Sequence, residues 1–404
     1  MNKRVHQIAA ASSAVVLASG IFAGFASVSA NAASKKVTIK LWADNNAYKS
    51  VVKQFEKNNP NISVKFQKVG SVDTTKYMQK DSTTAGDVAM LPHDQLGTLV
   101  SQGLVLRVSP TYSKQVKKID VPGAVKGATY KGKMYGYPYG VETQVLYYNK
   151  SKLSASDVKT WSGITKKGKL AVNFGETGAN YVWTPLFFTN GDVLFGKNGE
   201  NASGTNFGNA KGTQVLQWIQ AQKNNPGVVQ DNAGALQDLT SGKVDAFLSG
   251  PWSKIDAQKA LKNNYAVAKY PKISIGGKNK QLQAFLGVKL FIVNKSTKHP
   301  AQAAKLASYL TSNAVQKKIF TSIGYVPSAK SVQNSAAVKK DALSKAVTQM
   351  SKGATPMPKI PEINNFWTPM DAIFNDTWKG KISQSQMLSK LQAFDKQIAK
   401  SSSK

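Results

Sequence analysis

Residues 37 to 66 change from a strand pattern to a helix pattern and back, and this order constrains the possible folds more than any other feature of the chain. Val37, Ile39 and Leu41 alternate with polar residues, which indicates a half-buried strand. Apolar residues then recur at helical spacing, at Tyr48, Val51, Val52 and Phe55. A second strand pattern covers residues 62–66. A strand, a helix and a strand over this length predict parallel strands with helices on both faces of the sheet, and hence an α/β protein.

A third strand is predicted at residues 86–91, which run directly into the polar loop of residues 92–95. In open α/β sheets, ligands bind at the loops that follow the carboxyl ends of the strands. We therefore expect residues 92–95 to lie at a binding site.

The first 32 residues have the pattern of a cleaved secretory signal. Lys3 and Arg4 precede an apolar run over residues 8–28, and Ala30 and Ala32 form an A-x-A cleavage site. A membrane anchor is the alternative, but small residues interrupt the run and no charged cluster directly follows it. We expect an exported protein whose remaining roughly 370 residues exceed one ordinary core and form two domains.

The residues needed for several kinds of chemistry are missing. The chain has no cysteine, which excludes disulfides, thiolate metal sites, cysteine nucleophiles and a lipid-modified cysteine. One of the three histidines lies in the signal, and neither H-E-x-x-H nor G-x-S-x-G occurs. Residues 127–133 have the spacing of a nucleotide-binding loop, but Met134 replaces the required Ser or Thr. We expect no metal, no cofactor and no catalytic residue.

The net charge is strongly positive, at +33, with 54 Lys and Arg against 21 Asp and Glu. Such a field attracts polyanions. Arg4 and Arg107 are the only arginines, whereas specific reading of nucleic acids relies on arginine. We therefore expect no specific nucleic-acid partner. The charge suits electrostatic association with an anionic cell wall or membrane surface, or it serves solubility alone.

Two glutamates lie in polar breaks beside aromatic residues, Glu142 in YGVETQVLYYN and Glu176 in NFGETGANYVW. A pair of carboxylates at a suitable separation can hydrolyse a glycosidic bond. Two solvated loop glutamates are the alternative, because Glu is usually exposed.

Several aromatic residues lie where the chain is expected to turn. These are Tyr181, Trp183, Trp252 and, after a segment that Pro358 and Pro361 stiffen, Trp367. The C–H face of a sugar ring stacks on an aromatic plane, while carboxylates accept hydrogen bonds from its hydroxyls. This mixture of residues predicts carbohydrate binding.

Five segments carry a resemblance to a known family. They are VTIKLWADNN, GDVAMLPHDQLGTLVSQGLV, YKGKMYGYPYGVETQVLYYNKSKL, SGKVDAFLSGPWSKID and MPKIPEINNFW. They occur in the order found in maltose- and maltodextrin-binding proteins, the extracellular solute-binding components of ABC importers. The chain resembles this family over roughly residues 37 to 404. A generic α/β protein has no reason to carry GYPYGVETQVLYYNK, SGPW and the proline-spaced segment in that order.

The resemblance implies a two-lobed periplasmic-binding-protein-like fold, with hinge crossovers and a sugar cleft between the lobes. After the signal peptide, residues 1–32, it implies an N-terminal lobe of residues 33–140 and 291–334. The C-terminal lobe would then comprise residues 141–290 and 335–404.

The resemblance also implies which side chains contact the sugar. Asp94 resembles a first-lobe aspartate that binds sugar hydroxyls, and Asp44 is a second position carried over from that lobe. The remaining positions that match family contacts are Glu142, Glu176, Tyr181, Trp252, Met357 and Trp367.

Three positions depart from the family pattern. Gln95 stands where the family often has an arginine, and Leu91 replaces a tryptophan. Asp371 stands near where a second arginine is expected. This chain therefore lacks one stacking face and two guanidinium groups of the family pattern. Its ligand could be a longer maltodextrin or a different oligosaccharide.

These observations together predict an exported receptor, extracellular at the cell surface or periplasmic, without a lipid-modified cysteine. We expect it to bind a maltodextrin as a monomer and to deliver it to an ABC permease in the membrane without chemistry. The alternatives are a receptor for a different oligosaccharide, a cationic protein associated with the cell wall, and a glycoside hydrolase.

Overall fold

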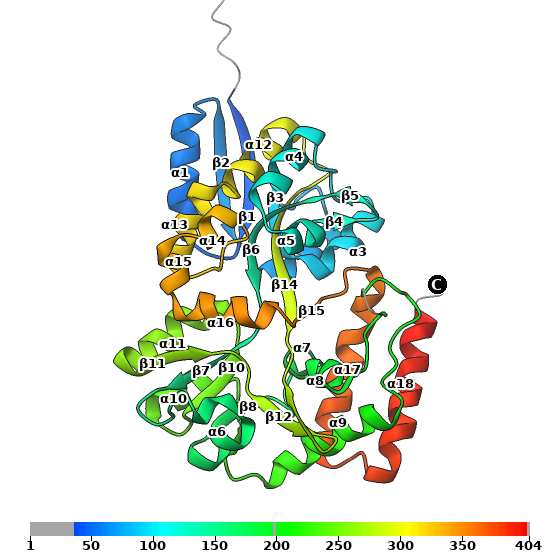
Figure 1. Ribbon diagram of the computed structural model, residues 1–404. Helices are drawn as coiled ribbons and strands as arrows, with labels where there is room; N and C mark the ends of the chain where they lie inside the picture. The colour runs from blue at the N-terminus through cyan, green and yellow to red at the C-terminus, as the bar shows by residue number, and fades with distance from the viewer. Residues whose placement is uncertain (1–35, 197–198, 402–404) are drawn as a thin grey trace, which may run out of the picture. The chain divides into compact units, whose positions relative to one another are not determined.

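Two β-sheets, each with helices packed against it, organise the chain (Figure 1). The computed structural model describes residues 36–196 and 199–401. The predicted signal peptide, residues 1–32, lies outside the described residues. The mixed helix and sheet architecture predicted from the sequence is confirmed.

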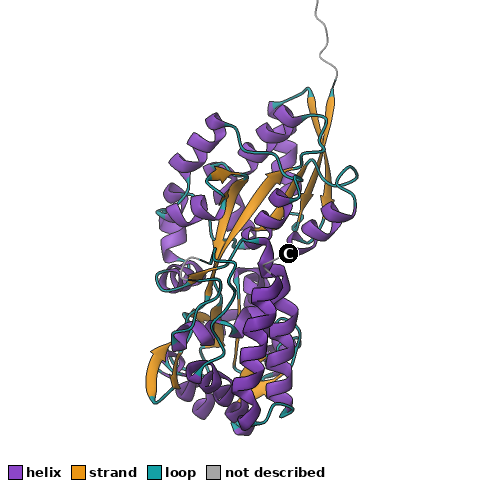
Figure 2. Ribbon diagram, turned by 90° about the vertical axis from the view of Figure 1, so that its right-hand side faces the viewer, coloured by secondary structure: helices purple, strands orange, loops and turns teal. Residues whose placement is uncertain are grey.

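The first sheet has six strands, in the order β15-β14-β3-β1-β2, with β6 also paired to β14. Its strands are β1 (Val37–Ala43), β2 (Ile62–Lys68), β3 (Val88–Pro92), β6 (Gly136–Glu142), β14 (Phe285–Val293) and β15 (Thr355–Pro356). β1 runs parallel to both β2 and β3, and β14 runs antiparallel to β3 and β6. Figure 2 shows helices on both sides of this sheet, as the strand–helix–strand pattern predicts.

The second sheet has five strands, in the order β11-β7-β10-β8-β9. They are β7 (Val145–Asn149), β8 (Leu170–Val172), β9 (Val228–Gln230), β10 (Ala246–Ser249) and β11 (Tyr265–Ala268). β10, β8 and β9 are parallel neighbours, whereas β7 runs antiparallel to β10 and β11. Two further two-stranded ribbons pair β4 (Thr129–Tyr130) with β5 (Lys133–Met134), and β12 (Lys272–Ile275) with β13 (Lys278–Gln281).

The helices divide between the two sheets (Figure 1). Around the first lie α1 (Tyr48–Asn58), α2 (Thr74–Lys80), α3 (Leu96–Ser101), α4 (Pro110–Ile119), α5 (Pro122–Gly127), α12 (Pro300–Leu310), α13 (Asn313–Ile323), α14 (Lys330–Gln333) and α15 (Ala336–Lys340). Around the second lie α6 (Trp161–Lys167), α7 (Ala179–Trp183), α8 (Pro185–Asn190), α9 (Ala210–Ala221), α10 (Ala235–Ser241), α11 (Lys254–Leu261), α16 (Ala342–Ser351), α17 (Asn364–Lys379) and α18 (Met387–Ser401).

Local sequence signals explain several of these elements. In α1 the residues at helical spacing, Tyr48, Val51, Val52 and Phe55, are the buried ones. In the hairpin of β4 and β5, Lys131 and Gly132 have φ values of 46° and 74°. Two successive residues with positive φ suit a two-residue hairpin turn, because their twist matches that of the strands.

Three passages of the chain between the sheets lie near the expected lobe boundaries, and a further excursion after α16 brings β15 to the first sheet before α17. The chain leaves β6 and enters β7 through residues 143–144, and it returns through residues 282–284 into β14. The third passage precedes α16, which packs against β7 and β11. The expected lobe boundaries at 140/141 and 290/291 therefore fall inside β6 and β14. Both strands remain hydrogen-bonded to each other through Gly287 and Glu142.

Two aromatic segments differ locally from the expectation. Tyr181 and Trp183 lie in helix α7, not in a loop, and Trp183 is fully buried in the core. Phe366 and Trp367 lie in the first turn of α17, not ahead of it, and Phe366 is fully buried. The segment that Pro358 and Pro361 stiffen is extended at Ile360, and the single turn Pro361–Ile363 then leads directly into the helix.

Within residues 36–196 and 199–401, no helix is both long enough and apolar enough to cross a membrane.

Candidate functional site

A cleft of about 510 Å³ lies between loops of the first sheet and helices of the second. It is lined by Asp44, Gly70, Ser71, Val72, Pro92, Asp94, Gln95, Glu142, Asn180, Tyr181, Trp252, Lys289, Tyr325, Met357 and Trp367. Seven of the eight predicted contact residues are among them, all except Glu176. We call this cavity the cleft.

Strand ends position many of the lining residues. Asp44 directly follows β1, and Asp94 lies in the turn His93–Gln95 that follows β3. On the other side, Trp252 lies in the turn Pro251–Ser253, just after β10. Because parallel strands end at the same edge of a sheet, each sheet delivers its loops to one place. The loops that follow the carboxyl ends of strands in both sheets therefore line the cleft.

Two carboxylates, Asp44 and Asp94, hold buried acceptor oxygens at the cleft. Asp94 is 7% exposed, and burial raises its pKa to about 7; a hydrogen bond from its own backbone opposes this rise and Glu142 adds to it. Burial also raises the pKa of Asp44, against the opposing charge of Lys289. Oδ1 of Asp44 and Oδ1 of Asp94 are buried without a hydrogen-bond partner. Buried acceptors without partners are costly, so these two atoms are suited to a ligand's donors.

Lys289 supplies the positive charge of the cleft. Its Nζ lies 3.2 Å from Oε2 of Glu142, and the two side chains are only 11% and 6% exposed. Burial alone would lower the pKa of Lys289, but Glu142, Asp44 and Asp94 outweigh it and raise the pKa. The ammonium is thus held in its charged form among three carboxylates.

The same ammonium also faces aromatic rings. Nζ of Lys289 lies 6.0 Å from the ring centroid of Trp252 and 5.5 Å from that of Tyr325. Both distances are within the range of cation–π attraction. Lys289 therefore connects the acidic side of the cleft to its aromatic side.

The ring of Phe285 packs against two of the aromatic side chains that line the cleft. Tyr181 stacks on Phe285 with ring centroids 5.9 Å apart and planes 10° apart, and Trp367 meets Phe285 edge-on at 5.9 Å. Trp252 is 44% exposed and lies 6.2 Å from Tyr181. The side-chain amide of Asn180 donates a 2.8 Å hydrogen bond to the carbonyl of Trp367. Rigid, partly exposed aromatic planes beside unpaired acceptors can stack on an apolar ring face and bind its hydroxyls.

Glu176 lies apart from this set. Its carboxylate accepts hydrogen bonds from Nε2 of Gln230 at 2.7 Å and from the backbone amides of Asn232 and Ala233. It thus ties its own loop to the segment after β9. Its expected contact with a ligand stays a prediction, and Glu176 does not line the cleft that Glu142 lines.

The positions that depart from the family pattern have internal partners. Gln95 accepts a hydrogen bond from Thr75 and donates one to the carbonyl of Val72. Leu91 is fully buried in β3. Asp371 accepts hydrogen bonds from the backbone amides of Gly178 and Asn180 at the start of α7, which fixes the helix that carries Tyr181.

Sequence reasoning missed Lys289, Tyr325 and Asn180 as lining residues. The signal for Lys289 was a single lysine within the otherwise apolar strand FLGVKLFIV, since a buried charge needs a specific partner. Tyr325 follows Gly324, whose φ of +77° ends helix α13. No sequence pattern distinguishes its ring from those of the core.

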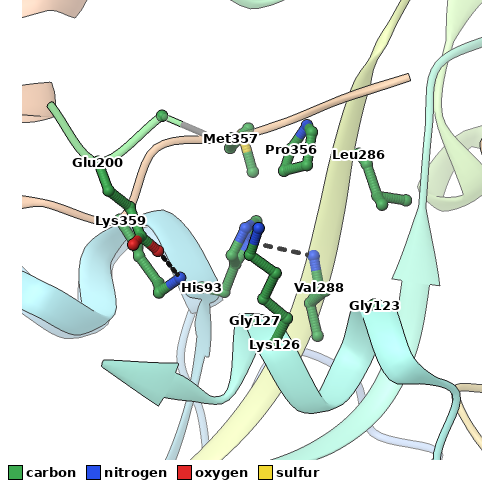
Figure 3. A pocket seen from close by; sticks show the side chains of 11 residues that line it. His93, Gly123, Lys126, Gly127, Glu200, Leu286, Val288, Pro356, Met357 and Lys359 are labelled. Carbon is green, nitrogen blue, oxygen red and sulfur yellow. Dashed lines mark hydrogen bonds and ion pairs between the residues drawn. The ribbon is translucent and has the colours of Figure 1, made fainter. Parts of the chain in front are cut away.

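A much smaller cavity, of about 40 Å³, lies beside Met357 (Figure 3). There the backbone amide of Val288 donates a 3.1 Å hydrogen bond to Nδ1 of His93, and burial lowers the pKa of His93 to about 3. Lys359 pairs with Glu200 across the same cavity at 2.5 Å. A space of this size suits a water molecule and not an organic ligand. In the part of the chain that the structure describes, no cluster of three or more His, Asp or Glu side chains could hold a metal ion.

Comparisons with known proteins agree on one group. Residues 50–346 match the family described as bacterial extracellular solute-binding protein. The chain is 29% identical over 383 residues to the galactooligosaccharide-binding protein of Bacillus subtilis, covering 90% of this chain and 89% of that protein. It is 28% identical to the maltodextrin-binding protein MdxE of B. subtilis, covering 83% and 82%. The maltodextrin-binding protein MalE1 from L. casei BL23, solved without ligand, superposes with a TM-score of 0.83 and 40% identity over 90% of this chain and 99% of that one.

Proposed function

The chain belongs to the family of bacterial extracellular solute-binding proteins, and we propose that it captures a maltodextrin-type oligosaccharide in the cleft and delivers it to an ABC importer. One observation carries the proposal. The cleft joins partly exposed aromatic planes to buried carboxylate oxygens that lack hydrogen-bond partners. The names of similar proteins, which bind maltodextrins or galactooligosaccharides, support the same ligand class.

The proposed sugar contacts divide into stacking and hydrogen-bonding groups. Trp252, Trp367 and Tyr181 would stack on the C–H faces of successive sugar rings, because a large flat side chain loses little rotamer freedom. Asp44, Asp94 and Glu142 would accept hydroxyl hydrogen bonds, which are stronger to a charged acceptor than to a neutral one. Met357 would pack against the sugar from the proline-spaced segment. To these predicted residues we add Lys289 and Asn180, as donors from the cleft wall.

We infer that the two sheets and their helices form lobes that close on the ligand. The crossings between them would lie at residues 143–144, at 282–284 and near Asp341, which is supported by the strand pairings and by the packing of α16 on β7 and β11. A sugar that contacts both sides of the cleft favours the closed form by its differential affinity for that form. The closed form would be the one that the permease recognises.

The proposal involves no chemistry and requires a single chain. Seven of the eight predicted contact residues line this one cleft, so we expect a monomer to bind. The similar proteins are named as binding proteins, which favours release of the sugar unaltered.

A receptor for a galactooligosaccharide is a second candidate. A galactooligosaccharide-binding protein and a maltodextrin-binding protein are similar to this chain at 29% and 28% identity, respectively. The two ligand classes differ in ring stereochemistry and linkage, so they place their hydroxyls differently against the same carboxylates.

Titration calorimetry of the exported chain tests the proposal. The ligands are maltotriose, a β-galactotriose and glucose, and each is recovered afterwards and analysed for cleavage. We expect tight binding of intact maltotriose and weak binding of glucose, which spans only one stacking face. Preference for the galactotriose would select the second candidate, and binding of neither trisaccharide would contradict both.

A further inference from the structure

We propose that a groove lined by lysines beside α4, α5 and the β4–β5 hairpin binds a linear phosphodiester polymer of the cell wall. This groove has a volume of about 550 Å³. It is lined by Lys117, Asp120, Pro122, Val125, Lys126, Thr129, Lys131, Gly132, Glu200, Lys330 and Lys359. We call it the lysine groove. None of these residues lines the cleft, so this site is separate from the one proposed for the sugar.

The acidic residues of the groove are already engaged. Glu200 forms an ion pair with Lys359 at 2.5 Å. Asp120 is 2% exposed and accepts a 2.6 Å hydrogen bond from the hydroxyl of Ser328. The remaining charges are lysines, so the open part of the groove is positive.

Three of these lysines are free to meet an anion. Lys117, Lys126 and Lys131 are exposed, and none of them forms an ion pair with any residue in the described ranges. Elsewhere the chain does pair exposed lysines, as Lys243 does with Asp231 and Asp238. Unpaired ammonium groups around one concavity repel one another, and a bound polyanion would relieve this repulsion.

The positive charge continues along the surface beyond the groove. Over residues 110–133, Lys114, Lys118 and Lys133 are also exposed, and Asp120 is the only acidic residue in this stretch. Lys131 lies at the tip of the hairpin, where its Nζ faces the ring of Tyr130 at 5.5 Å. A track of lysines over two helices and a hairpin suits a ligand with repeated charges better than a single ion.

The spread of the lysines and the type of basic residue favour a polymer chain as the occupant. A thin, flexible chain can reach lysines inside the concavity, whereas a membrane surface would touch only its rim. Lysine is a compact charge on a flexible stem and follows phosphates that have no fixed geometry, whereas arginine suits planar, bidentate recognition. No arginine lines the groove. The adjoining small cavity shares Lys126, Glu200 and Lys359 but holds only about 40 Å³, so it cannot admit the polymer (Figure 3).

Two triple variants of equal charge test the proposal. The groove variant carries Lys117→Gln, Lys126→Gln and Lys131→Gln. The control carries Lys379→Gln, Lys390→Gln and Lys396→Gln, which replace exposed lysines on α17 and α18 that form no ion pair in the described ranges. Binding of the exported chain to purified, lipid-free poly(glycerol phosphate) is measured over a range of salt concentrations. Vesicles of phosphatidylglycerol and phosphatidylcholine serve as a parallel ligand, and maltotriose affinity and thermal unfolding are measured for all proteins.

We expect the groove variant to lose about tenfold or more in polymer affinity at low salt, with a shallower salt dependence, because three phosphate contacts are removed. The control should lose less than about threefold, as expected for screened charges far from the site. Equal losses in both variants, or no loss in the groove variant, would overturn the proposal, as would binding to vesicles without binding to the polymer. Maltotriose affinity should not change in either variant, so failure here is distinct from failure of the sugar-binding proposal.

Discussion

The Nζ atom of Lys289 lies 3.2 Å from Oε2 of Glu142, and this ion pair joins strand β14 to strand β6 beside two of the chain crossings. Both side chains are largely buried, and two further carboxylates act on the same ammonium. The charges of Lys289 and the nearby carboxylates thus depend on one another, and removal of one charged group leaves the others without a partner of opposite charge.

We predict that Lys289→Met lowers the free energy of unfolding by about 3 kcal/mol, because it leaves a buried carboxylate without its partner. The measurement is chemical denaturation of the ligand-free protein. Lys289→Met combined with Glu142→Gln should cost less than the sum of the two single variants, because the double variant leaves no unpaired charge in that pair. Strict additivity of the two changes would show that the pair is not coupled.

We predict that sugar affinity falls as the pH drops below about 7, and that Asp94 is responsible. Burial raises the pKa of Asp94 to about 7, so the free protein protonates this carboxylate below that pH. A sugar hydroxyl that donates to the carboxylate needs it ionised, so binding must then release a proton, and affinity falls by up to about tenfold per pH unit. Asp94→Asn should bind more weakly at pH 8 but lose this dependence.

The control for the pH prediction is Asp120→Asn. Burial raises the pKa of Asp120 to about 6, but Asp120 lies in the lysine groove and not in the cleft. Titrations of sugar binding between pH 5 and 8 should show the wild-type profile in this variant.

The folding stability of the ligand-free protein should change with pH in the opposite direction to the sugar affinity. A carboxyl whose pKa is raised on folding makes the ligand-free protein less stable as the pH rises from about 4 to about 7.

We predict that Trp252→Ala and Trp367→Ala each weaken maltotriose binding by at least about 1 kcal/mol, or roughly fivefold, through loss of an aromatic stacking face. Tyr77→Ala is a matched control, because Tyr77 is 45% exposed, close to the 44% of Trp252, and does not line the cleft. Calorimetry at one pH suffices. Unchanged affinity in both tryptophan variants would remove these residues from the sugar site.

We predict that Glu142→Gln and Glu176→Gln differ in their effects. Glu142 lines the cleft, so its replacement by a neutral acceptor should weaken sugar binding several-fold. Glu176 instead accepts hydrogen bonds from the segment after β9, so Glu176→Gln should mainly lower thermal stability. A loss of sugar affinity in this variant would support the ligand contact predicted for Glu176. Chromatography of the recovered sugar checks for turnover. Cleavage by the wild type that disappears in either variant would establish a hydrolase instead of a receptor.

Much of the architecture could be predicted from local patterns. The spacing of Val37, Ile39 and Leu41, followed by helix α1, required parallel strands because one face of each element must be buried. The position of Asp94 after a buried strand then predicted its place in the cleft, since strand ends meet at one edge.

The placement of some side chains could not be predicted, because packing between distant segments determines it. Trp183 and Trp367 each follow an apolar residue and precede Thr and Pro, but helix α7 turns Trp183 into the core and α17 turns Trp367 towards the cleft. The role of Lys289 depends on carboxylates from three other segments, and no spacing within one strand reveals them. The lobe boundaries at 140/141 and 290/291 stay a prediction, and both fall inside strands β6 and β14, which are hydrogen-bonded to each other.

Phe285 begins strand β14 directly after the crossing of residues 282–284, and its ring supports both Tyr181 and Trp367. If this crossing is the hinge we propose, Phe285 belongs both to the hinge and to the aromatic surface that binds the sugar. Selection for a new ligand through these rings then also changes the balance between open and closed forms. Specificity and transport rate in this protein would evolve together, and an engineered change of sugar preference would need a second adjustment at the hinge.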